Sequence, residues 1–501
     1  MIEATATLQE NAIVLLVAFP IVAALVPIVL GLLSDRTGWI VAAITSLVQV
    51  ILALAVFRQV QATGPFSYEV GGFAPPFGIE LIADGVSAPL LVLVAVTTVG
   101  VVAYAHRIGP HENEFYTELM LLMTGLSGLV ATGDVFNLYV FLEITGLATY
   151  ALVASGRSPE AALASLKYLL IGTIGASLYL FGVGYLYLAT GTLNMADLST
   201  SLAAVGYGSP LVLTGFGLVV VGLSVKVALF PLHTWQPDAY AESPHAVSAY
   251  ISALVSTAAA YALFRILYAV FTVDFFAAVP FARDMLVLLA AVSVVVGAVL
   301  AVMQSDLKRM LAYSSVSQFG IVVAALAIAN ETAILGSLVH LVGHAVMKAG
   351  LFLAVGVLAT SLGARTVDEY AGIGYRAPVT SGAFAVLAFS LVGVPPAIGF
   401  AGKWTILLGA VEANSWALTV VIVTSTLLTL AYFGRLVEKM YFTAPPADVA
   451  DRVATDGGTE PSVSFAMRAL VVLVAAAAVA LGIVATDLLA TFEPVVEVYF
   501  A

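Results

Sequence analysis

Seven ionisable residues occur inside long apolar stretches of the sequence, where a charged side chain is costly. On insertion scales a charge at the centre of a membrane-spanning helix costs about 2.5–3.5 kcal/mol, so each such residue requires a structural or functional reason. Carboxylate, ammonium and imidazole groups can each bind and release a proton. When these groups are buried, neighbouring charges change their proton affinity. The pattern therefore predicts a path for protons that comprises Glu143, Lys167, Lys226, His340, His344, Lys348 and Lys403.

Glu143 lies in the middle of the apolar segment 135–156. The functional interpretation is a proton carrier whose proton affinity depends on its distance from a lysine. The structural alternative is a carboxylate that a lysine holds in place only to orient two helices. Lys167, in the next apolar segment, is expected to bridge Glu143 toward Lys226.

Lys226 and Lys403 both occur beside residues that interrupt helices. Gly222 and Pro231 flank Lys226, and two prolines and two glycines precede Lys403 within one apolar segment. Proline removes a backbone hydrogen bond from a helix, and the freed carbonyl groups can stabilise an ammonium group or water. We therefore predict an interrupted helix at each lysine. The alternative for Lys226 is a side chain that extends to the cytoplasmic interface.

His340, His344 and Lys348 are spaced four residues apart, which places them on one stripe of an apolar helix. Two histidines at this spacing could bind a metal ion, but no glutamate accompanies them in the zinc-hydrolase pattern and the chain has no cysteine. A polar stripe that faces the helix bundle and is joined by water fits better. The alternative is that the histidines only form hydrogen bonds between helices.

A relay of these residues requires no cofactor, but it requires a source of energy. Moving one charge against 100 mV takes about 2.3 kcal/mol. The sequence contains no Gly-x-x-x-x-Gly-Lys-Ser/Thr loop for a nucleotide. The energy must then come from an ion gradient or from an attached redox machine.

The composition places these residues in a membrane protein. The chain of 501 residues is 61% hydrophobic and only 10% charged, whereas about a quarter of the residues of soluble domains are charged. Its mean hydropathy is +1.08. The net charge of −12 argues against nucleic acid as a partner, and the first apolar run is too long for a signal peptide, so we interpret it as a retained helix.

Apolar runs long enough to span a bilayer recur along the whole chain. We predict an all-α polytopic protein in which residues 1–501 form a single transmembrane domain, with one flexible loop at 441–465. The fourteen predicted spans are 12–33, 38–57, 84–105, 115–132, 135–156, 163–190, 209–230, 245–271, 284–304, 310–329, 332–361, 381–408, 414–440 and 466–490.

Basic residues predict the orientation of these spans, because cytoplasmic loops carry an excess of lysine and arginine. With the N-terminus outside, only Arg58, Arg265 and Arg283 fall on the external side. Both termini are then expected outside the cell membrane. Eleven basic residues fall on the cytoplasmic side: Arg36, Arg107, Arg157, Lys308, Arg309, Arg365, Arg376, Arg435, Lys439, Arg452 and Arg468.

The ionisable residues also recur at a nearly constant offset. Lys226 and Lys403 are 177 residues apart, Lys167 and His344 are 177 apart, and Glu143 and Gln318 are 175 apart. Two five-helix units, 115–271 and 284–440, explain this offset. Five is odd, so the second unit enters the membrane from the opposite side, as in transporters built from inverted repeats.

The six lysines are few for a chain of this length, and the loop at 441–465 is acidic. Such a surface suits a salt-rich cytoplasm, and the hypothesis is an extreme halophile. The alternative is drift within an acidic family.

Four segments, 132–143, 191–198, 226–239 and 306–315, resemble the D subunit of Mrp-type multisubunit cation/proton antiporters. The resemblance covers essentially the whole chain and extends, less closely, to the antiporter-like subunits of respiratory complex I and membrane-bound hydrogenases. It implies fourteen helices, inverted five-helix repeats and broken helices 7 and 12. It also implies a pair of Glu143 with Lys226, a central relay through the sixth and eleventh spans, and Lys403 as the terminal lysine.

One position departs from this family. Related subunits often carry a further lysine one helix after the Lys226 equivalent, and Thr257 stands there in this chain. The link from Lys226 to the centre would then depend on water near Ser256 and Thr257, helped by His245.

Three functions remain open at this point. The first is an Mrp-type subunit that exchanges cytoplasmic Na⁺ for external protons and works only together with other membrane subunits. The second is the proton-pumping arm of a complex I-type or hydrogenase-type redox complex. The chain would then be a subunit of an oxidoreductase and would carry no redox centre of its own. The third is a stand-alone solute transporter or an inert scaffold.

Overall fold

The computed structural model describes residues 2–32, 34, 36–109, 111–444 and 464–500. Most of the predicted loop at 441–465 lies outside these residues, together with its acidic side chains. The proposal of a salt-rich cytoplasm therefore stays a prediction, and loss of stability on removal of molar salt would test it.

Each of the fourteen predicted spans coincides with a helix or with a broken helix. Eleven of these elements are single helices, a twelfth is the interrupted helix at His245–Ala278, and two are broken. The eleven helices are α1 (Ile2–Gly31), α2 (Gly38–Thr63), α3 (Ser87–Ile108), α4 (Asn113–Ala131), α5 (Val135–Ala154), α6 (Pro159–Thr190), α13 (Pro280–Val302), α14 (Leu307–Ala327), α15 (Glu331–Leu362), α19 (Trp416–Phe442) and α21 (Phe465–Ile483).

The two broken helices are the seventh and twelfth spans, as predicted. The first comprises α8 (Pro210–Val227) and α9 (Gln236–Glu242), and the second comprises α17 (Pro378–Val392) and α18 (Ile398–Glu412). Each half of the second is too short to cross a bilayer of about 30 Å alone. Irregular backbone at this depth is tolerated where it is buried in protein or lines a cavity.

The eighth span contains two π-helical turns. Its parts are α10 (His245–Tyr250), the π turn η2 (Ile251–Val255), α11 (Ser256–Arg265), the π turn η3 (Ile266–Phe271) and α12 (Thr272–Ala278). Such turns inside a helix occur frequently at functional sites.

Some elements were not predicted. Strands β1 (Phe66–Glu69) and β2 (Glu80–Ala83) pair in antiparallel register, with Phe66 opposite Ala83. The third predicted span starts at residue 84, but α3 starts at Ser87 because the Asp84 carboxylate accepts the backbone N–H groups of Val86 and Ser87. The remaining short elements are η1 (Val70–Gly72), α7 (Met195–Val205), η4 (Asp368–Tyr370), α16 (Ile373–Arg376) and α22 (Ala485–Glu497).

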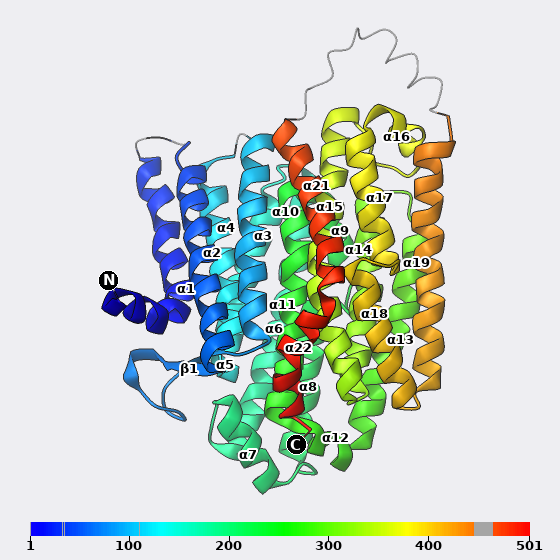
Figure 1. Cartoon of the computed structure of the whole chain (residues 1–501). Helices are drawn as coiled ribbons and strands as arrows, with labels where there is room; N and C mark the ends of the chain where they lie inside the picture. Colours follow the sequence, from blue (N-terminus) through cyan, green and yellow to red (C-terminus); the bar gives the residue numbers. More distant parts are fainter. Residues whose placement is uncertain (1, 33, 35, 110, 445–463, 501) are drawn as a thin grey trace.

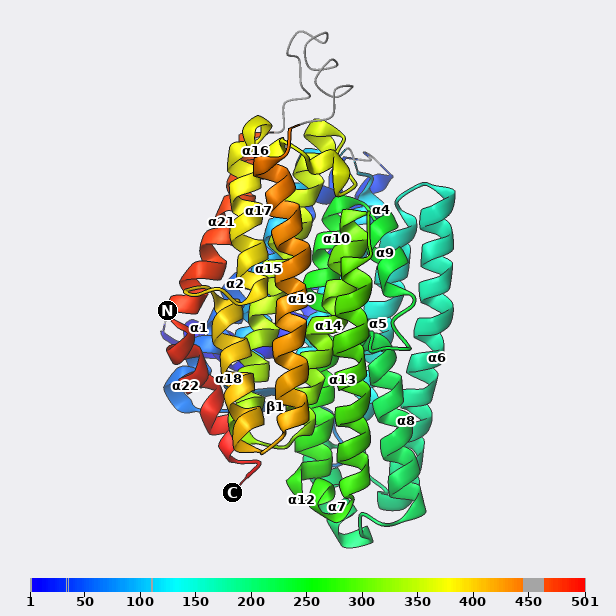
Figure 2. The same ribbon diagram turned by 90° about the vertical axis from the view of Figure 1, so that its right-hand side faces the viewer.

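Within the described residues, twelve helices are long and apolar enough to cross a membrane. Helix α4 is less apolar because its first two turns carry Asn113, Glu114 and Glu118, and the halves of the twelfth span are short. Figures 1 and 2 show a bundle with α7, α12 and the C-terminus at one end and α16 at the other. We call these the α7 end and the α16 end; the positive-inside prediction makes the α16 end cytoplasmic.

Three helices form the interior of the bundle. In α14, α15 and His245–Ala278, 94% of the most apolar stretch is buried, compared with 22% for α21 at the surface. The same packing order occurs twice, because α6 contacts α5 and α8 while α15 contacts α14 and α18. Helices α6 and α15 also have the same length of 32 residues. The predicted five-helix units and their inverted relation stay predictions.

Candidate functional site

Lys226 lies in the last turn of α8, where the seventh span breaks. The helix ends at Ala228, which has a positive φ of 66°, and the chain becomes helical again at Gln236. The freed carbonyl groups are used by neighbouring side chains: Trp235 Nε1 donates to the Val225 oxygen at 2.9 Å, and Ser256 Oγ donates to the Lys226 oxygen at 3.3 Å. The expectation that these carbonyls hold the ammonium group is therefore wrong.

The Lys226 ammonium group donates instead to the hydroxyl of Tyr150 on α5, at 3.1 Å. The side chain is only 4% exposed, which excludes the alternative of extension to the interface. Glu143 lies two turns before Tyr150 on the same face of α5. Its charge acts on Lys226, but no direct ion pair joins them among the described residues. The expected Glu143–Lys226 pair therefore stays a prediction, because the hydrogen-bond partner of the Lys226 ammonium group is Tyr150.

Two glycines make room for this contact. A Cβ atom at Gly146 would lie 3.2 Å from Lys226 Nζ and 3.0 Å from the Tyr150 hydroxyl. A Cβ atom at Gly172 of α6 would collide with the same hydroxyl. The absence of a side chain at Gly146 of α5 and at Gly172 of α6 therefore leaves room for the Tyr150 hydroxyl beside the Lys226 ammonium group.

Replacing Gly172 with alanine is expected to lower proton transport about tenfold to a hundredfold, because a shift of about 1 Å in a reacting group can cost that much. The hydroxyl is at the end of a side chain that can turn aside, so the complex should still assemble. Gly184→Ala is the matched control, because a Cβ atom there meets nothing within 4 Å on the same helix. Proton uptake by vesicles at equal expression measures both; equal rates would contradict this role.

Lys167 does not bridge Glu143 toward Lys226. Its ammonium group lies 2.6 Å from Asp238 Oδ2, and Arg309 Nη1 lies 2.6 Å from Asp238 Oδ1. The Lys167 side chain is 38% exposed. The predicted bridging role is corrected to an ion pair that ties α6 and α14 to α9.

The predicted stripe on α15 is buried in the centre of the bundle. His340, His344 and Lys348 are all 0% exposed. His340 Nε2 and Gln318 Oε1 of α14 are 3.0 Å apart, whereas both ring nitrogens of His344 lack a hydrogen-bond partner within the described residues. In proteins, buried polar atoms without a protein partner are often hydrogen-bonded to a bridging water molecule. The stripe fits the interpretation of a polar line joined by water.

Lys348 is anchored by the neighbouring helix. Its ammonium group donates to the Leu311 carbonyl at 2.6 Å and to the Ser314 hydroxyl, both on α14. In the described part of the chain no carboxylate lies within ion-pair distance of this buried charge. The Lys348 ammonium group is therefore held by two neutral oxygens of α14.

Lys403 lies just after the second break and is held by the freed carbonyl groups there. Its ammonium group donates to the Leu391 oxygen at 2.7 Å and to the Val392 oxygen at 3.3 Å. These carbonyls end α17, where the helix dipole is negative. A Cβ atom at Gly402 would lie 2.7 Å from the backbone of His340, so α18 and α15 are in close contact beside the α15 stripe.

Ser256 and Thr257 carry the small hydroxyl groups that are predicted to link Lys226 to the centre. Ser256 Oγ donates to the Lys226 carbonyl oxygen and accepts from Gln236 Nε2 at 3.2 Å. Thr257 is 2% exposed, and its hydroxyl has no partner in the described residues. His245, expected to help, lies instead toward the α16 end, near Lys308.

Several polar residues of the site were not singled out from the sequence. Tyr150 could have been found from its spacing of two turns after Glu143. Lys308 is predicted only to lie on the cytoplasmic side, and the structure shows that it is 8% exposed. Its ammonium group donates to the carbonyls of Ala241 and Ser243 at 3.1 and 2.7 Å, which joins α14 to the turn after α9.

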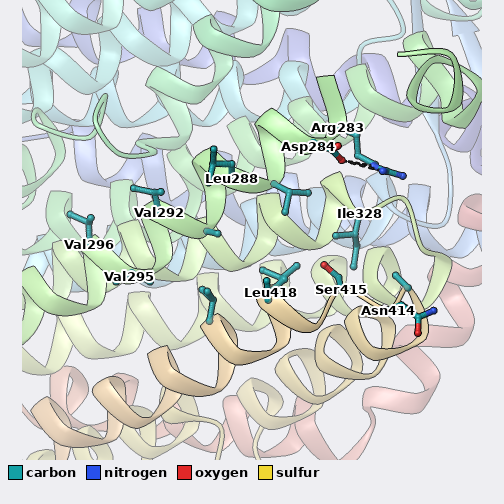
Figure 3. Close-up of a pocket in the computed structure, with 15 residues that line it drawn as sticks. Arg283, Asp284, Leu288, Val292, Val295, Val296, Ile328, Asn414, Ser415 and Leu418 are labelled. Atoms are coloured by element: carbon teal, nitrogen blue, oxygen red, sulfur yellow. Dashed lines mark hydrogen bonds and ion pairs between the residues drawn. The ribbon is translucent and has the colours of Figure 1, made fainter. Parts of the chain in front are cut away.

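A large hollow lies away from these residues. A groove of about 760 Å³ between α13 and α19 is lined mostly by valine and leucine, including Leu288, Val292 and Leu418 (Figure 3). The Arg283–Asp284 pair lies at one end. None of the seven predicted residues lines it, so the groove is a feature of the outer surface of the bundle.

The fold and the site together define a class: a polytopic membrane protein with broken helices and a line of buried ionisable groups. Residues 132–429 match the family described as NADH:quinone oxidoreductase/Mrp antiporter, transmembrane. The chain belongs to this family and is an antiporter-like, proton-translocating membrane subunit.

Two curated relatives illustrate its breadth. The chain is 44% identical over 401 residues to the N subunit of the NADH-quinone oxidoreductase of Desulforudis audaxviator, covering 79% of each chain. It is 31% identical over 388 residues to the D subunit of the Na(+)/H(+) antiporter of Bacillus subtilis, covering 77% of this chain and 78% of that one.

Two solved structures have the same fold. A chain of the membrane-bound sulfane sulfur reductase, an archaeal respiratory complex, matches with a TM-score of 0.89 and 31% identity over 98% of this chain and 99% of that one. A chain of the Mrp complex from Dietzia sp. DQ12-45-1b matches with a TM-score of 0.87 and 25% identity over 98% and 97%.

Proposed function

We propose that this chain is the proton-conducting subunit of a multisubunit antiporter that exchanges cytoplasmic Na⁺ for external protons. The observation that carries the proposal is the buried line of His340, His344 and Lys348, together with the two buried lysines at the helix breaks. The likeness to the D subunit of an Na(+)/H(+) antiporter and to a chain of an Mrp complex supports Na⁺ as the exchanged ion.

In this proposal protons pass along the buried groups in steps. Glu143 accepts a proton, and its charge state acts on Lys226 through the region of Tyr150. Ser256 and Thr257 lead to the stripe on α15, and Lys403 is the last group of the line. The ammonium groups of Lys226, Lys348 and Lys403 are each held by neutral oxygens.

The proposal places the chain in the cell membrane with the α16 end in the cytoplasm and both termini outside. It works within an assembly of other membrane subunits, as the relatives named above do. Lys167 is retained only as part of the ion pair with Asp238, near the cytoplasmic end of α6.

The proposal is tested with vesicles that contain the whole complex and an imposed pH gradient. A pulse of Na⁺ without an electron donor is expected to dissipate the gradient, because the antiporter needs only the two ion gradients. Protein-free vesicles give the passive leak. If Na⁺ has no effect while the complex is intact, the exchange function is wrong.

A second function is favoured by the 44% identity to an NADH-quinone oxidoreductase subunit. The chain would then be the proton-pumping arm of a redox complex. In that case the same vesicles would move protons only after addition of an electron donor and a quinone, and Na⁺ would not dissipate the gradient.

A further inference from the structure

A second cluster of buried polar groups lies toward the α7 end and is not part of the line described above. Arg265 Nη2 is bonded to Asp84 Oδ2, and the two residues are 8% and 5% exposed. Arg265 Nε also donates to the Tyr261 hydroxyl at 2.7 Å, and Nη1 donates to the Tyr499 hydroxyl at 3.1 Å. The cluster thus joins the start of α3, helix α11 and the segment after α22.

This cluster forms the inner wall of a cavity. The cavity has a volume of about 580 Å³, and Tyr261, Arg265 and Tyr499 line it. Asp274 and Val498 also line it and are exposed at the surface. The cavity therefore connects the guanidinium group with the outside of the molecule at the α7 end, where α7 and α12 lie in Figures 1 and 2.

On the inner side, the cluster continues toward Lys226. Thr257, Tyr261 and Arg265 are spaced four residues apart and share one stripe of α11. Thr257 follows Ser256, which donates to the Lys226 carbonyl oxygen. The π turns η2 and η3 bracket this stretch, so its two ends can shift in register.

We propose that the Asp84–Arg265 pair, with Tyr261 and Tyr499, is the gate of a proton port between Thr257 and the cavity at the α7 end. The proposal rests on proton translocation by this chain. A guanidinium group stays charged and repels Na⁺ and hydronium, as arginines do in selective pores. When the Arg265 guanidinium group moves off Asp84 while it stays bonded to Tyr499, the Asp84 carboxylate is free to accept a proton from one side and release it to the other.

The structural alternative is an ion pair that only pins the start of α3 to α11. The chain has no cysteine, so single cysteines can distinguish the two roles. Ser199→Cys in the cavity wall and Thr257→Cys behind the gate are each labelled, in the whole complex in vesicles, with a membrane-impermeant methanethiosulfonate. Mass spectrometry of this chain measures the labelled fraction.

We expect Ser199→Cys to be labelled whatever residue 265 is. Thr257→Cys should be protected in the presence of Arg265 and become labelled when Arg265→Gln is added. Vesicles with Arg265→Gln alone should lose an imposed pH gradient several times faster. Arg283→Gln is the matched control, because it removes an exposed arginine from a neighbouring helix and not from the cavity.

Removing one partner of a buried pair leaves an uncompensated charge and can prevent assembly. The double variant Asp84→Asn with Arg265→Gln keeps the site neutral and is expected to give the same labelling of Thr257→Cys. Thr257→Cys that stays protected in both backgrounds, with a pH gradient as stable as in Arg283→Gln, would overturn the port. Labelling of Thr257→Cys requires no transport. A failure of the port is therefore distinguishable from a failure of the proposed relay, which the Glu143→Gln variant tests.

Discussion

Proton-coupled transport is expected to fall about a hundredfold or more when Lys403 is replaced by methionine, because loss of a positioned proton-transfer group removes about 10²–10⁴-fold of the rate. Lys403 follows the break between α17 and α18, and its ammonium group lies on the carbonyls of Leu391 and Val392. Methionine is unbranched and only one atom shorter than lysine, so the packing of α18 on α15 is expected to be retained.

The measurement is proton uptake by vesicles that contain the whole complex at equal expression. Lys439→Met is the matched control, because Lys439 forms an ion pair with the exposed Asp368 at the α16 end, and such pairs contribute little to stability. A Lys403→Met complex that assembles and transports like Lys439→Met would remove Lys403 from the path.

Glu143→Gln is expected to stop the relay at its first group, with a loss of similar size. Glutamine has the shape of glutamate but cannot take up and release a proton in this range of pH. Glu143 is half-buried, and its Oε1 has no hydrogen-bond partner among the described residues, so the amide can occupy the same position.

The same vesicles test this variant, with Glu160→Gln as the control because Glu160 is exposed in the first turn of α6. The Glu143→Gln complex should assemble in normal amounts and show no proton uptake above the protein-free leak. Unchanged transport would favour an inert scaffold, and a loss of assembly would favour a role in orienting helices.

The sequence alone determined which segments cross the membrane and where two of them break. Both follow from local chemistry: an apolar run of sufficient length can only be buried as a helix in a bilayer, and the prolines beside Lys226 and Lys403 interrupt the backbone hydrogen bonds wherever the segment lies. The sequence also identified the buried groups, because charges in such runs stand out against their neighbours.

Only the tertiary structure decided what each of these groups contacts. Lys226 and Lys403 both lie beside a break in a helix, but their partners differ. Lys226 donates to the hydroxyl of Tyr150, which is 76 residues away in the chain, whereas Lys403 donates to the freed carbonyl groups at its own break. Arg265 joins Asp84 across 181 residues. Hydropathy and proline positions predict the structure of one segment at a time. The partner of a long side chain depends on how neighbouring helices are rotated and on where a glycine lets two helices approach.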